Sequence, residues 1–443
     1  MSRPTLLIVD GPGGPTPEWY LPRLCPHYDV HILRRPSGNP AADERRWRPV
    51  DSWCRSFFAR EGGDLIDAIV AYAKLHDADG IVAFSEIPVV EAHTAADMLG
   101  LPGNPRESLA ALRNKRAQRE RLQAAGAPVP RFAEVRTLEE FEEALAQVGV
   151  PAVLKPVVGA GSMATYAVGS GTEVDALWRE ACRAYTADPR AAGLPRFILE
   201  QRLIGSQWYP DPRYGDYVSV ESIVSHGEIS HLAVTDKLPL SHPFRENGGM
   251  QPSVLPADRL AEIKKCATVA IEAIGITDSA VHTELKLTAE GPTVIEVNCR
   301  IGGSIAELLH LSAGYDYVQS IAAVATGRPL PPPPAPHRYA AYFIPQPPDR
   351  PVVLTKVPTT DEILAIPGVQ DTLLPHAVGT LLSPERGSVN YLAWVTAAAD
   401  RPQQLFDCLD LLNAPDLFAH RSPDRDGGSS GATPAHGGST DDR

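Results

Sequence analysis

The clearest alternation of hydrophobic and polar positions in the chain runs from residue 281 to residue 304. It predicts two short strands joined by a turn at 289–292, because alternate side chains of a strand point to the same face. One face of each strand is apolar and suited to a core. The other face of the first strand carries His282, Glu284 and Lys286. In the second strand one face carries Val294, Glu296, Asn298 and Arg300. The opposite, apolar face carries Ile295, Val297 and Cys299.

Two carboxylates and one amide converge on the polar face of this predicted hairpin. Folding about the turn brings Glu284 opposite the region of Glu296 and Asn298. Like charges at cross-strand distance are unfavourable unless a cation lies between them. Hard oxygen ligands completed by phosphate describe a magnesium–nucleotide site. The alternative is a hairpin with one solvated polar face, which antiparallel strands often have.

The polar row continues into a turn that is suited to anions. Arg300 extends the row by one step and is placed to hold an anion beyond the metal. Gly302, Gly303 and Ser304 then open a predicted helix, and free backbone N–H groups at a helix start accept negative charge.

The pattern of the first hundred residues predicts a small doubly wound domain. Apolar runs predict strands at 5–10, 30–33 and 80–84, and helical spacing predicts helices at 64–74 and 89–99. Glu86 follows the third strand, where open α/β sheets place ligand-contacting loops. The glycines at 11–14 lack the GxGxxG spacing of a dinucleotide site.

Helices and strands alternate through the middle of the chain. The predicted helices are 106–125, 137–148, 260–274 and 305–324, and the predicted strands are 151–156, 196–203, 217–224 and 229–237. The polar segment 238–256 is expected to be a functional or a disordered loop, because loops of this length are usually one or the other. Lys155 lies near the end of a strand, beside a loop containing Gly159, Gly161 and Ser162 whose amides can wrap phosphate. A lone helix lysine such as Lys115 is more often a solvated charge.

A proline-rich connector at 329–336 precedes the C-terminal region. That region is predicted to be a smaller α+β unit with strands at 340–344, 352–356, 379–382 and 391–396 and a helix at 403–412. The expected organisation is a doubly wound domain at 1–103, a central region with a lid at 104–200, a core with the metal and substrate site at 201–335, the α+β unit at 336–420, and a disordered tail at 421–443.

Composition narrows the partners and the compartment. The chain has 443 residues and a formal net charge of −13, which argues against a general nucleic-acid binder and against docking on anionic lipid. No apolar run approaches the roughly 20 residues of a membrane span, and the N-terminal run is too short for a signal peptide. The six scattered cysteines include no CxxC pair, so free thiols in a reducing cytoplasm are expected.

The order of these pieces resembles the ATP-grasp superfamily over roughly residues 3 to 415. Three segments carry the resemblance: RNKRAQRERLQAAGAPVP with Lys115, PAVLKPVVGAGS with Lys155, and HTELKLTAEGPTVIEVNCRIGGS. Within the superfamily the chain is most similar to carboxylate–amine ligases that join two L-amino acids, the bacilysin-type dipeptide ligases; the segments YVSVESIVSHGEISHLAVTDKLPL and QPSVLP look like their middle section. The resemblance implies an ATP-grasp fold of α/β and α+β parts.

The resemblance also implies a role for each matching residue. The phosphate and adenine contacts would come from Lys115, Lys155, Gly159, Gly161, Ser162, Glu200, Gln201, Leu203 and Ile204. The metal ligands would be Glu284, Glu296 and Asn298, and Arg300 with the amide of Gly303 would face the acyl phosphate and its tetrahedral adduct. Glu86 and Glu246 fall where such ligases place acids around substrate amino groups.

Three positions depart from the family pattern. Gln207 stands near where a ribose-binding acid is common. Gly249 replaces a histidine of the relatives, and Ser304 replaces a residue that can be a bulky aromatic in them. The small Gly249 and Ser304 are expected to leave room for a substrate side chain larger than that of alanine.

The activity implied is ATP-dependent amide-bond formation between a carboxylate and an amine through an acyl phosphate. The cofactors would be ATP and Mg²⁺, with Mn²⁺ as a substitute, and the partners would be small molecules, with a homodimer left open. A biotin-carboxylase-like enzyme on the same fold is one alternative, although none of the four methionines is followed by lysine. A catalytically silent ATP-binding regulatory protein is another, and the complete set of charged site residues argues against it.

Overall fold

The computed structural model describes residues 3–11, 14–36, 40–48, 50–59, 63–159, 161–162, 164–188, 191, 193–333, 335–384 and 390–423. The expected disordered tail at 421–443 therefore lies almost wholly outside the described residues. Within the described part, no helix combines the length and the apolar character needed to cross a bilayer.

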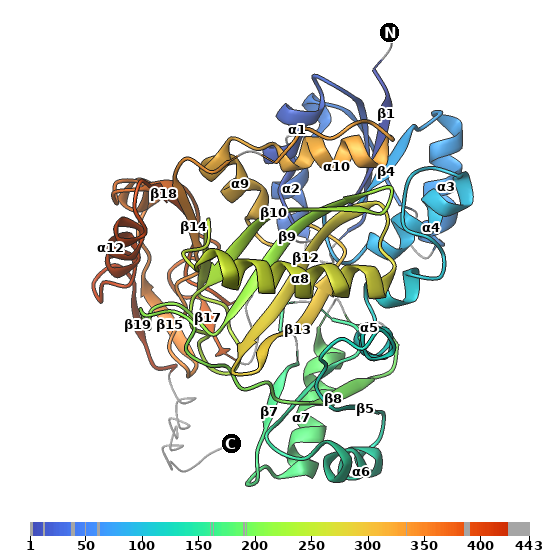
Figure 1. The fold of residues 1–443 in the computed structure, drawn as a ribbon. Coiled ribbons are helices and arrows are strands. Elements are labelled where there is room, and N and C mark those ends of the chain that lie inside the picture. The colour runs from blue at the N-terminus through green and yellow to red at the C-terminus, as the bar shows by residue number, and fades with distance from the viewer. Residues whose placement is uncertain are drawn as a thin grey trace, which may run out of the picture.

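The N-terminal region forms a parallel four-stranded sheet in the order β3-β2-β1-β4 (Figure 1). Its strands are β1 (Thr5–Asp10), β2 (Asp29–Arg34), β3 (Arg55–Phe58) and β4 (Gly80–Val82). Its helices are α1 (Pro17–Leu24), α2 (Pro40–Trp47), the 3-10 turn η1 (Val50–Ser52), α3 (Leu65–Leu75) and α4 (Val89–Leu99). The strands and helices predicted here are found within one or two residues. Sequence reasoning missed α1, α2 and β3.

The helix predicted at 106–125 is two shorter elements, so this prediction was wrong in its extent. They are the 3-10 helix η2 (Leu109–Leu112) and the α-helix α5 (Lys115–Ala124). The side chain of Asn114 accepts a hydrogen bond from the backbone N–H of Ala117 and so starts a new helix. Lys115 consequently stands in the first turn of α5 rather than in the middle of a long helix.

Residues 132–201 form a separate antiparallel sheet in the order β5-β8-β6-β7, at the bottom of Figure 1. Its elements are β5 (Phe132–Val135), α6 (Leu138–Val148), β6 (Ala152–Pro156), β7 (Tyr166–Val168), α7 (Val174–Ala187) and β8 (Phe197–Gln201). It has its own apolar core, in which Phe141, Trp178 and Phe197 pack together. We call residues 132–201 the lid.

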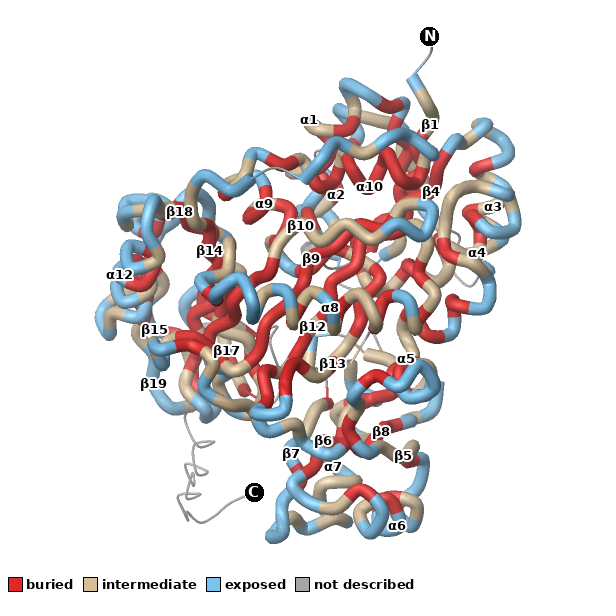
Figure 2. Tube along the Cα trace, viewed as in Figure 1, coloured by how far each residue is buried: buried red, intermediate tan, exposed pale blue. Residues whose placement is uncertain are grey.

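An eight-stranded sheet in the order β13-β12-β9-β10-β11-β14-β18-β16 forms the centre of the molecule. Its strands are β9 (Tyr217–Ser225), β10 (Glu228–Lys237), β11 (Gly248–Gln251), β12 (Ser279–Thr288), β13 (Gly291–Asn298), β14 (Tyr339–Phe343), β16 (Val369–Leu373) and β18 (Trp394–Ala399). Figure 2 shows β9, β12 and β14 as mostly buried. The helix α8 (Ala257–Ile274) covers one face and packs into the largest apolar core.

Two features of this sheet differ from the expectations. The polar segment 238–256 is not only a loop, because it contains β11, which pairs with β10 and β14. The helix predicted at 305–324 is two helices, α9 (Ile305–Ala313) and α10 (Tyr317–Ala325). Gly314 ends α9 in a left-handed conformation with φ of 67°, and the side chain of Asp316 caps α10.

The C-terminal residues contribute to two sheets. Strands β14, β16 and β18 continue the central sheet, so the expected boundary at 335/336 falls between strands of one sheet. A small three-stranded sheet in the order β17-β15-β19 lies beside it, with the helices α11 and α12. These elements are β15 (Val352–Lys356), α11 (Thr360–Leu364), β17 (Leu381–Leu382), α12 (Pro402–Leu412) and β19 (Ala419–Arg421).

Candidate active site

The hairpin of β12 and β13 places the predicted acidic side chains directly opposite one another. Glu284 is the cross-strand partner of Glu296, and His282 is the partner of Asn298. The alternation and the turn predicted that Glu284 faces the region of Glu296 and Asn298, and the structure gives the exact pairs. Two carboxylates and an amide oxygen in one row are a donor set for a hard divalent cation whose remaining ligands come from phosphate. Among the described residues, no three His, Cys, Asp or Glu side chains form a ready cluster for a metal ion.

A bulge in β13 changes one part of the predicted pattern. The register shifts between Glu284 and Leu285, so Glu284 pairs with Glu296 while Leu285 pairs with Val294. Val294 is therefore buried in the core, whereas the sequence pattern placed it on the polar face. A bulge adds one residue to one strand and reverses the facing of those beyond it.

A buried ion pair supports the carboxylate of Glu284. Its Oε1 lies 3.3 Å from Nε2 of His282, whose Nδ1 lies 2.8 Å from Oε2 of Glu221. Burial alone would lower the pKa of His282, but the Glu221 carboxylate raises it to about 9, so the imidazole is charged at neutral pH. Burial alone would raise the pKa of Glu284, but His282 lowers it to about 2. Glu284 is consequently held as an oriented carboxylate.

Glu296 is paired with the first lysine of the predicted phosphate-binding set. The Nζ atom of Lys115 lies 2.8 Å from Oε1 of Glu296 and donates a 2.9 Å hydrogen bond to the carbonyl oxygen of Gly159. Lys115 therefore joins the acidic row of the hairpin to the glycine-rich loop. In the same loop, Gly161 and Ser162 have positive φ angles of 65° and 56°. The hydroxyl of Ser162 in the lid donates a hydrogen bond to the carbonyl oxygen of Phe244, which lies outside the lid.

Lys155 on β6 belongs to a second charged cluster on the lid side of the site. Its Nζ lies 2.8 Å from Oε2 of Glu200, and Arg119 binds both carboxylate oxygens of Glu200 at 2.8 and 3.1 Å. Burial alone would raise the pKa of Glu200, but Arg119 and Lys155 lower it to about 2. Arg119 also donates a 2.6 Å hydrogen bond to the carbonyl oxygen of Ile295 in β13. It therefore links the lid to the hairpin of β12 and β13, which we call the metal hairpin after its predicted role.

The segment expected to contact adenine lies at the end of β8. The backbone N–H of Gln201 donates to the carbonyl of Arg131, just before the lid begins, so this amide already has a partner in the protein. The side chain of Glu200 is likewise engaged. Leu203 and Ile204 follow the strand, and Ile204 exposes 63% of its surface. An exposed aliphatic side chain here is suited to cover a flat base.

Arg300 and Glu86 connect the N-terminal sheet to the metal hairpin. The Nε atom of Arg300 lies 2.7 Å from Oε2 of Glu86, and both side chains are largely buried. Glu86 stands just after β4, at the carboxyl end of the parallel sheet. The structure thus brings these two predicted substrate residues together, although they are far apart in sequence. One oxygen of Glu86 is committed to Arg300.

Glu246 is held in a similar way by a buried lysine. The Nζ atom of Lys237 lies 2.6 Å from Oε1 of Glu246 and donates 2.8 Å to the hydroxyl of Tyr342. That hydroxyl in turn hydrogen-bonds Oε1 of Glu246. Burial alone would lower the pKa of Lys237, but Glu246 raises it above its usual range, so the lysine stays charged.

The small residues Gly249 and Ser304 do not leave an open space, so that expectation was wrong. A Cβ atom at Gly249 would lie 3.0 Å from the ring of Tyr342 and 3.0 Å from the methyl group of Thr235. Trp394 donates a 2.6 Å hydrogen bond from its indole N–H to the hydroxyl of Ser304. Two aromatic rings from the C-terminal region therefore occupy the room that these substitutions create.

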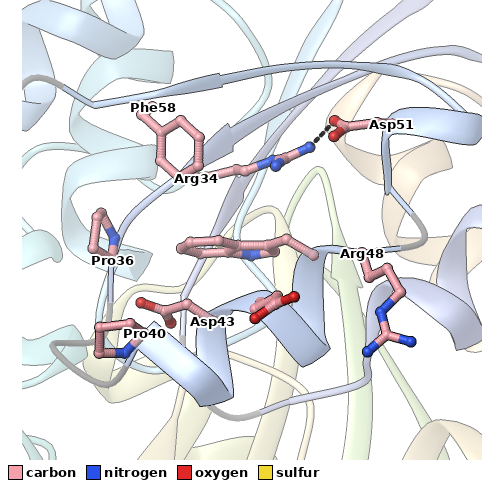
Figure 3. Close-up of a pocket in the computed structure, with 9 residues that line it drawn as sticks. Arg34, Pro36, Pro40, Asp43, Arg48, Asp51 and Phe58 are labelled. Atoms are coloured by element: carbon pink, nitrogen blue, oxygen red, sulfur yellow. Dashed lines mark hydrogen bonds and ion pairs between the residues drawn. The ribbon is translucent and has the colours of Figure 1, made fainter.

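A pocket on the surface of the N-terminal region lies away from this site. It has a volume of about 460 Å³ and lies on α2 at the carboxyl ends of β2 and β3 (Figure 3). Arg34 lines it and is paired there with Asp51, and its guanidinium lies 5.3 Å from the ring centre of Phe58. None of the predicted site residues lines this pocket.

Several side chains of the site were missed by sequence reasoning. Arg119 had a visible signal, because it stands one helical turn after Lys115. His282 also had one, because it lies on the polar face of the predicted hairpin. Glu221, Lys237, Tyr342 and Trp394 come from separate strands and had no local signal.

Comparison with known proteins identifies the segment that carries the metal hairpin and most of the lid. Residues 148–307 match the model of the ATP-grasp domain. The alanine–anticapsin ligase of Bacillus subtilis strain 168 is 27% identical over 332 residues, which is 68% of this chain and 70% of that protein. A second alanine–anticapsin ligase of Bacillus subtilis and that of Bacillus amyloliquefaciens are each 27% identical over 315 residues, which is 65% of this chain and 66% of those proteins, just under two thirds.

Solved structures show the same fold over nearly the whole chain. The L-amino acid ligase of Bacillus licheniformis superimposes with a TM-score of 0.77 at 21% identity, covering 96% of this chain and 100% of that one. The biotin carboxylase of Campylobacter jejuni superimposes with a TM-score of 0.64 at 16% identity, covering 94% and 92%. Identities this low establish the fold alone.

Proposed function

We propose, from the premise that this chain belongs to the ATP-grasp superfamily, that it is an ATP-dependent ligase forming an amide bond between an amino acid and a second amine. Proteins of this superfamily bind ATP with a divalent metal ion. The observation that carries the proposal is the pairing of Glu284 with Glu296 beside Lys115. This arrangement joins a metal-ligand row to a phosphate-binding lysine.

The residues of the site fit nucleotide and metal. Glu284, Glu296 and Asn298 would hold Mg²⁺, for which Mn²⁺ could substitute, because both prefer oxygen ligands. The bound nucleotide and metal supply the phosphoryl group and neutralise its charge. Lys115, Lys155 and the amides of Gly159, Gly161 and Ser162 would bind the phosphates. Ile204 would cover the base.

The reaction at the acyl carbon follows from the position of Arg300. A carboxylate oxygen of the first substrate takes the phosphoryl group from ATP, and ADP leaves. The amine nitrogen of the second substrate then attacks the acyl carbon, phosphate leaves, and the nitrogen loses a proton. Arg300 and the amide of Gly303 would stabilise the oxyanion of the tetrahedral adduct.

The relatives distinguish this reaction from carboxylation. The similarity to biotin carboxylase concerns the fold alone, whereas the sequence relatives include amino-acid ligases. The L-arginine-specific L-amino acid ligase of Bacillus subtilis is a further such relative. Glu86 and Glu246, each with one oxygen committed to a cation, would use the other to receive substrate ammonium groups.

The test is the release of ADP by the purified full chain with Mg·ATP. Pairs of amino acids should raise the rate well above that with ATP alone, and mass spectrometry should find a product lighter than the pair by one water. ADP release that depends on bicarbonate and gives no condensed product would instead support a carboxylase. A chain that binds ATP and releases no ADP with any pair would support a silent regulatory protein.

The lid should close over the nucleotide. Contacts of Lys115 with Gly159 and of Ser162 with Phe244 join its loop to helix α5 and to the segment between β10 and β11. A bound triphosphate would accept hydrogen bonds from amides of the loop, so hydrogen exchange at Gly159, Gly161 and Ser162 should slow at saturating Mg·ATP. The exposed lid helix α6 is the internal control. Equal exchange of the loop with and without nucleotide would contradict the lid.

A further inference from the structure

Trp394, at the start of β18, lies against the residues that face the acyl carbon. Its indole N–H donates 2.6 Å to the hydroxyl of Ser304. A Cβ atom built on Gly303 would lie 3.2 and 3.3 Å from two carbons of its six-membered ring. The ring edge therefore covers Gly303 on the side where any other residue would project a side chain.

The ring is fixed in this position by other aromatic side chains. Trp394 stacks on Tyr342 with a centroid separation of 5.8 Å and an interplanar angle of 13°. Tyr391 meets it edge to face at 5.5 Å. The hydroxyl of Tyr342 is held by Lys237 and Glu246, the acid expected near a substrate amino group. Aromatic pairs of this kind add to the packing energy and restrict rotation of the rings.

The ring of Trp394 is only partly buried, whereas Tyr342 behind it is 1% exposed. One edge of a rigid apolar ring thus lies beside Gly303, and the hydroxyl of the stacked Tyr342 contacts Glu246. A substrate whose carboxylate reached Arg300 and the Gly303 amide would place its Cα substituents within a side-chain length of this ring.

We propose that Trp394 is the specificity-determining wall of the pocket for the side chain of the acyl-donating amino acid, and that it favours small aliphatic side chains over bulky ones. The inference rests on the proposed function, because it takes Arg300 and Gly303 to mark the acyl carbon. The small residues Gly249 and Ser304 leave space for two aromatic rings, Tyr342 of β14 and Trp394 of β18.

The test compares selectivity between donors in the wild type and in Trp394→Ala. ADP release is measured with glycine, alanine, leucine and phenylalanine in pairs. Removing the ring should raise the ratio of kcat/KM for phenylalanine over alanine about 10- to 100-fold, which is the range that one pocket contact commands. The KM for ATP should stay the same. Trp394→Phe keeps a ring and should shift the ratio far less.

Two further variants keep the outcome clear. Ser304→Ala removes the acceptor of the indole hydrogen bond while keeping the volume, so a small shift in the same direction is expected. Trp53→Ala, at an exposed tryptophan of the N-terminal region, is the matched control for losing an indole and should leave the ratio unchanged. Calorimetric binding of the same amino acids in the presence of Mg·ADP gives a second measurement that does not depend on turnover.

Each outcome decides something. If Trp394→Ala is active and keeps the wild-type ratio of kcat/KM for phenylalanine over alanine, Trp394 does not determine donor specificity. The proposal that the chain is a ligase is unaffected by that result. If Trp394→Ala fails to fold, Trp394→Leu, which retains apolar packing, must show the shift or the wall is overturned. A wild type with no amino-acid-dependent ADP release overturns the ligase proposal itself and the wall with it.

Discussion

Glu296→Gln should lower kcat by about 10³-fold or more, because metal stabilisation of a transferring phosphoryl group is worth several kcal/mol. Glutamine is nearly isosteric but lacks the negative charge that binds the cation. In the nucleotide-free chain the ammonium group of Lys115, 2.8 Å away, supplies the positive charge beside Glu296. Glutamine can still accept a hydrogen bond from that lysine, so the fold should be retained.

The measurement is a titration of activity with Mg²⁺ at fixed ATP, together with thermal unfolding. The variant should need far more Mg²⁺ and should unfold close to the wild-type temperature. Glu290→Gln is the matched control, since Glu290 belongs to the turn of the same hairpin and is exposed. A Glu296→Gln enzyme with kcat within tenfold of wild type would remove Glu296 from the metal site.

Arg300→Met should lower kcat by about 10²- to 10³-fold, the usual cost of losing one donor to an oxyanion. This change has a second effect, because it leaves the carboxylate of Glu86 without the guanidinium that lies 2.7 Å away. An unpaired, largely buried charge costs about 3–5 kcal/mol of stability. Loss of activity alone could then reflect loss of the fold.

A double variant separates the two effects. Arg300→Met with Glu86→Gln removes the unpaired charge, so its stability should recover toward wild type while kcat stays low. Glu86→Gln alone keeps Arg300 and should chiefly raise the KM for an amino-acid substrate. If the double variant recovers both stability and turnover, Arg300 holds the structure and has no part in catalysis.

The metal hairpin was predictable because its signal is local. A period of two over eight residues fixes which side chains share a face, and one turn fixes the pairing of Glu284 with Glu296. The bulge that buries Val294 was not predictable, since an extra residue leaves the alternation itself intact on either side. The break at Asn114 had a visible signal, because asparagine is a preferred helix cap.

The partners of the site residues were less accessible to sequence reasoning. Glu86 with Arg300, Lys237 with Tyr342, and Trp394 with Ser304 are contacts between strands or turns far apart along the chain. Each depends on how the N-terminal sheet and the C-terminal strands dock on the central sheet. No residue spacing in the sequence indicates how these sheets pack together. Glu86 and Glu246 were therefore predicted to lie near the substrate, but their ion pairs with Arg300 and Lys237 were not predicted.

The pairing of β11 with β14 has a consequence for exchanging parts between related enzymes. The proline-rich connector at 329–336 has the composition of a domain boundary. However, Gly248–Gln251 before it pair through backbone hydrogen bonds with residues 340–343 after it. A chimera joined at the connector would combine a glycine at 249 and a serine at 304 from one parent with aromatic residues from another. Tyr342 and Trp394 must therefore be inherited together with the small residues they cover, and recombination at this point separates them.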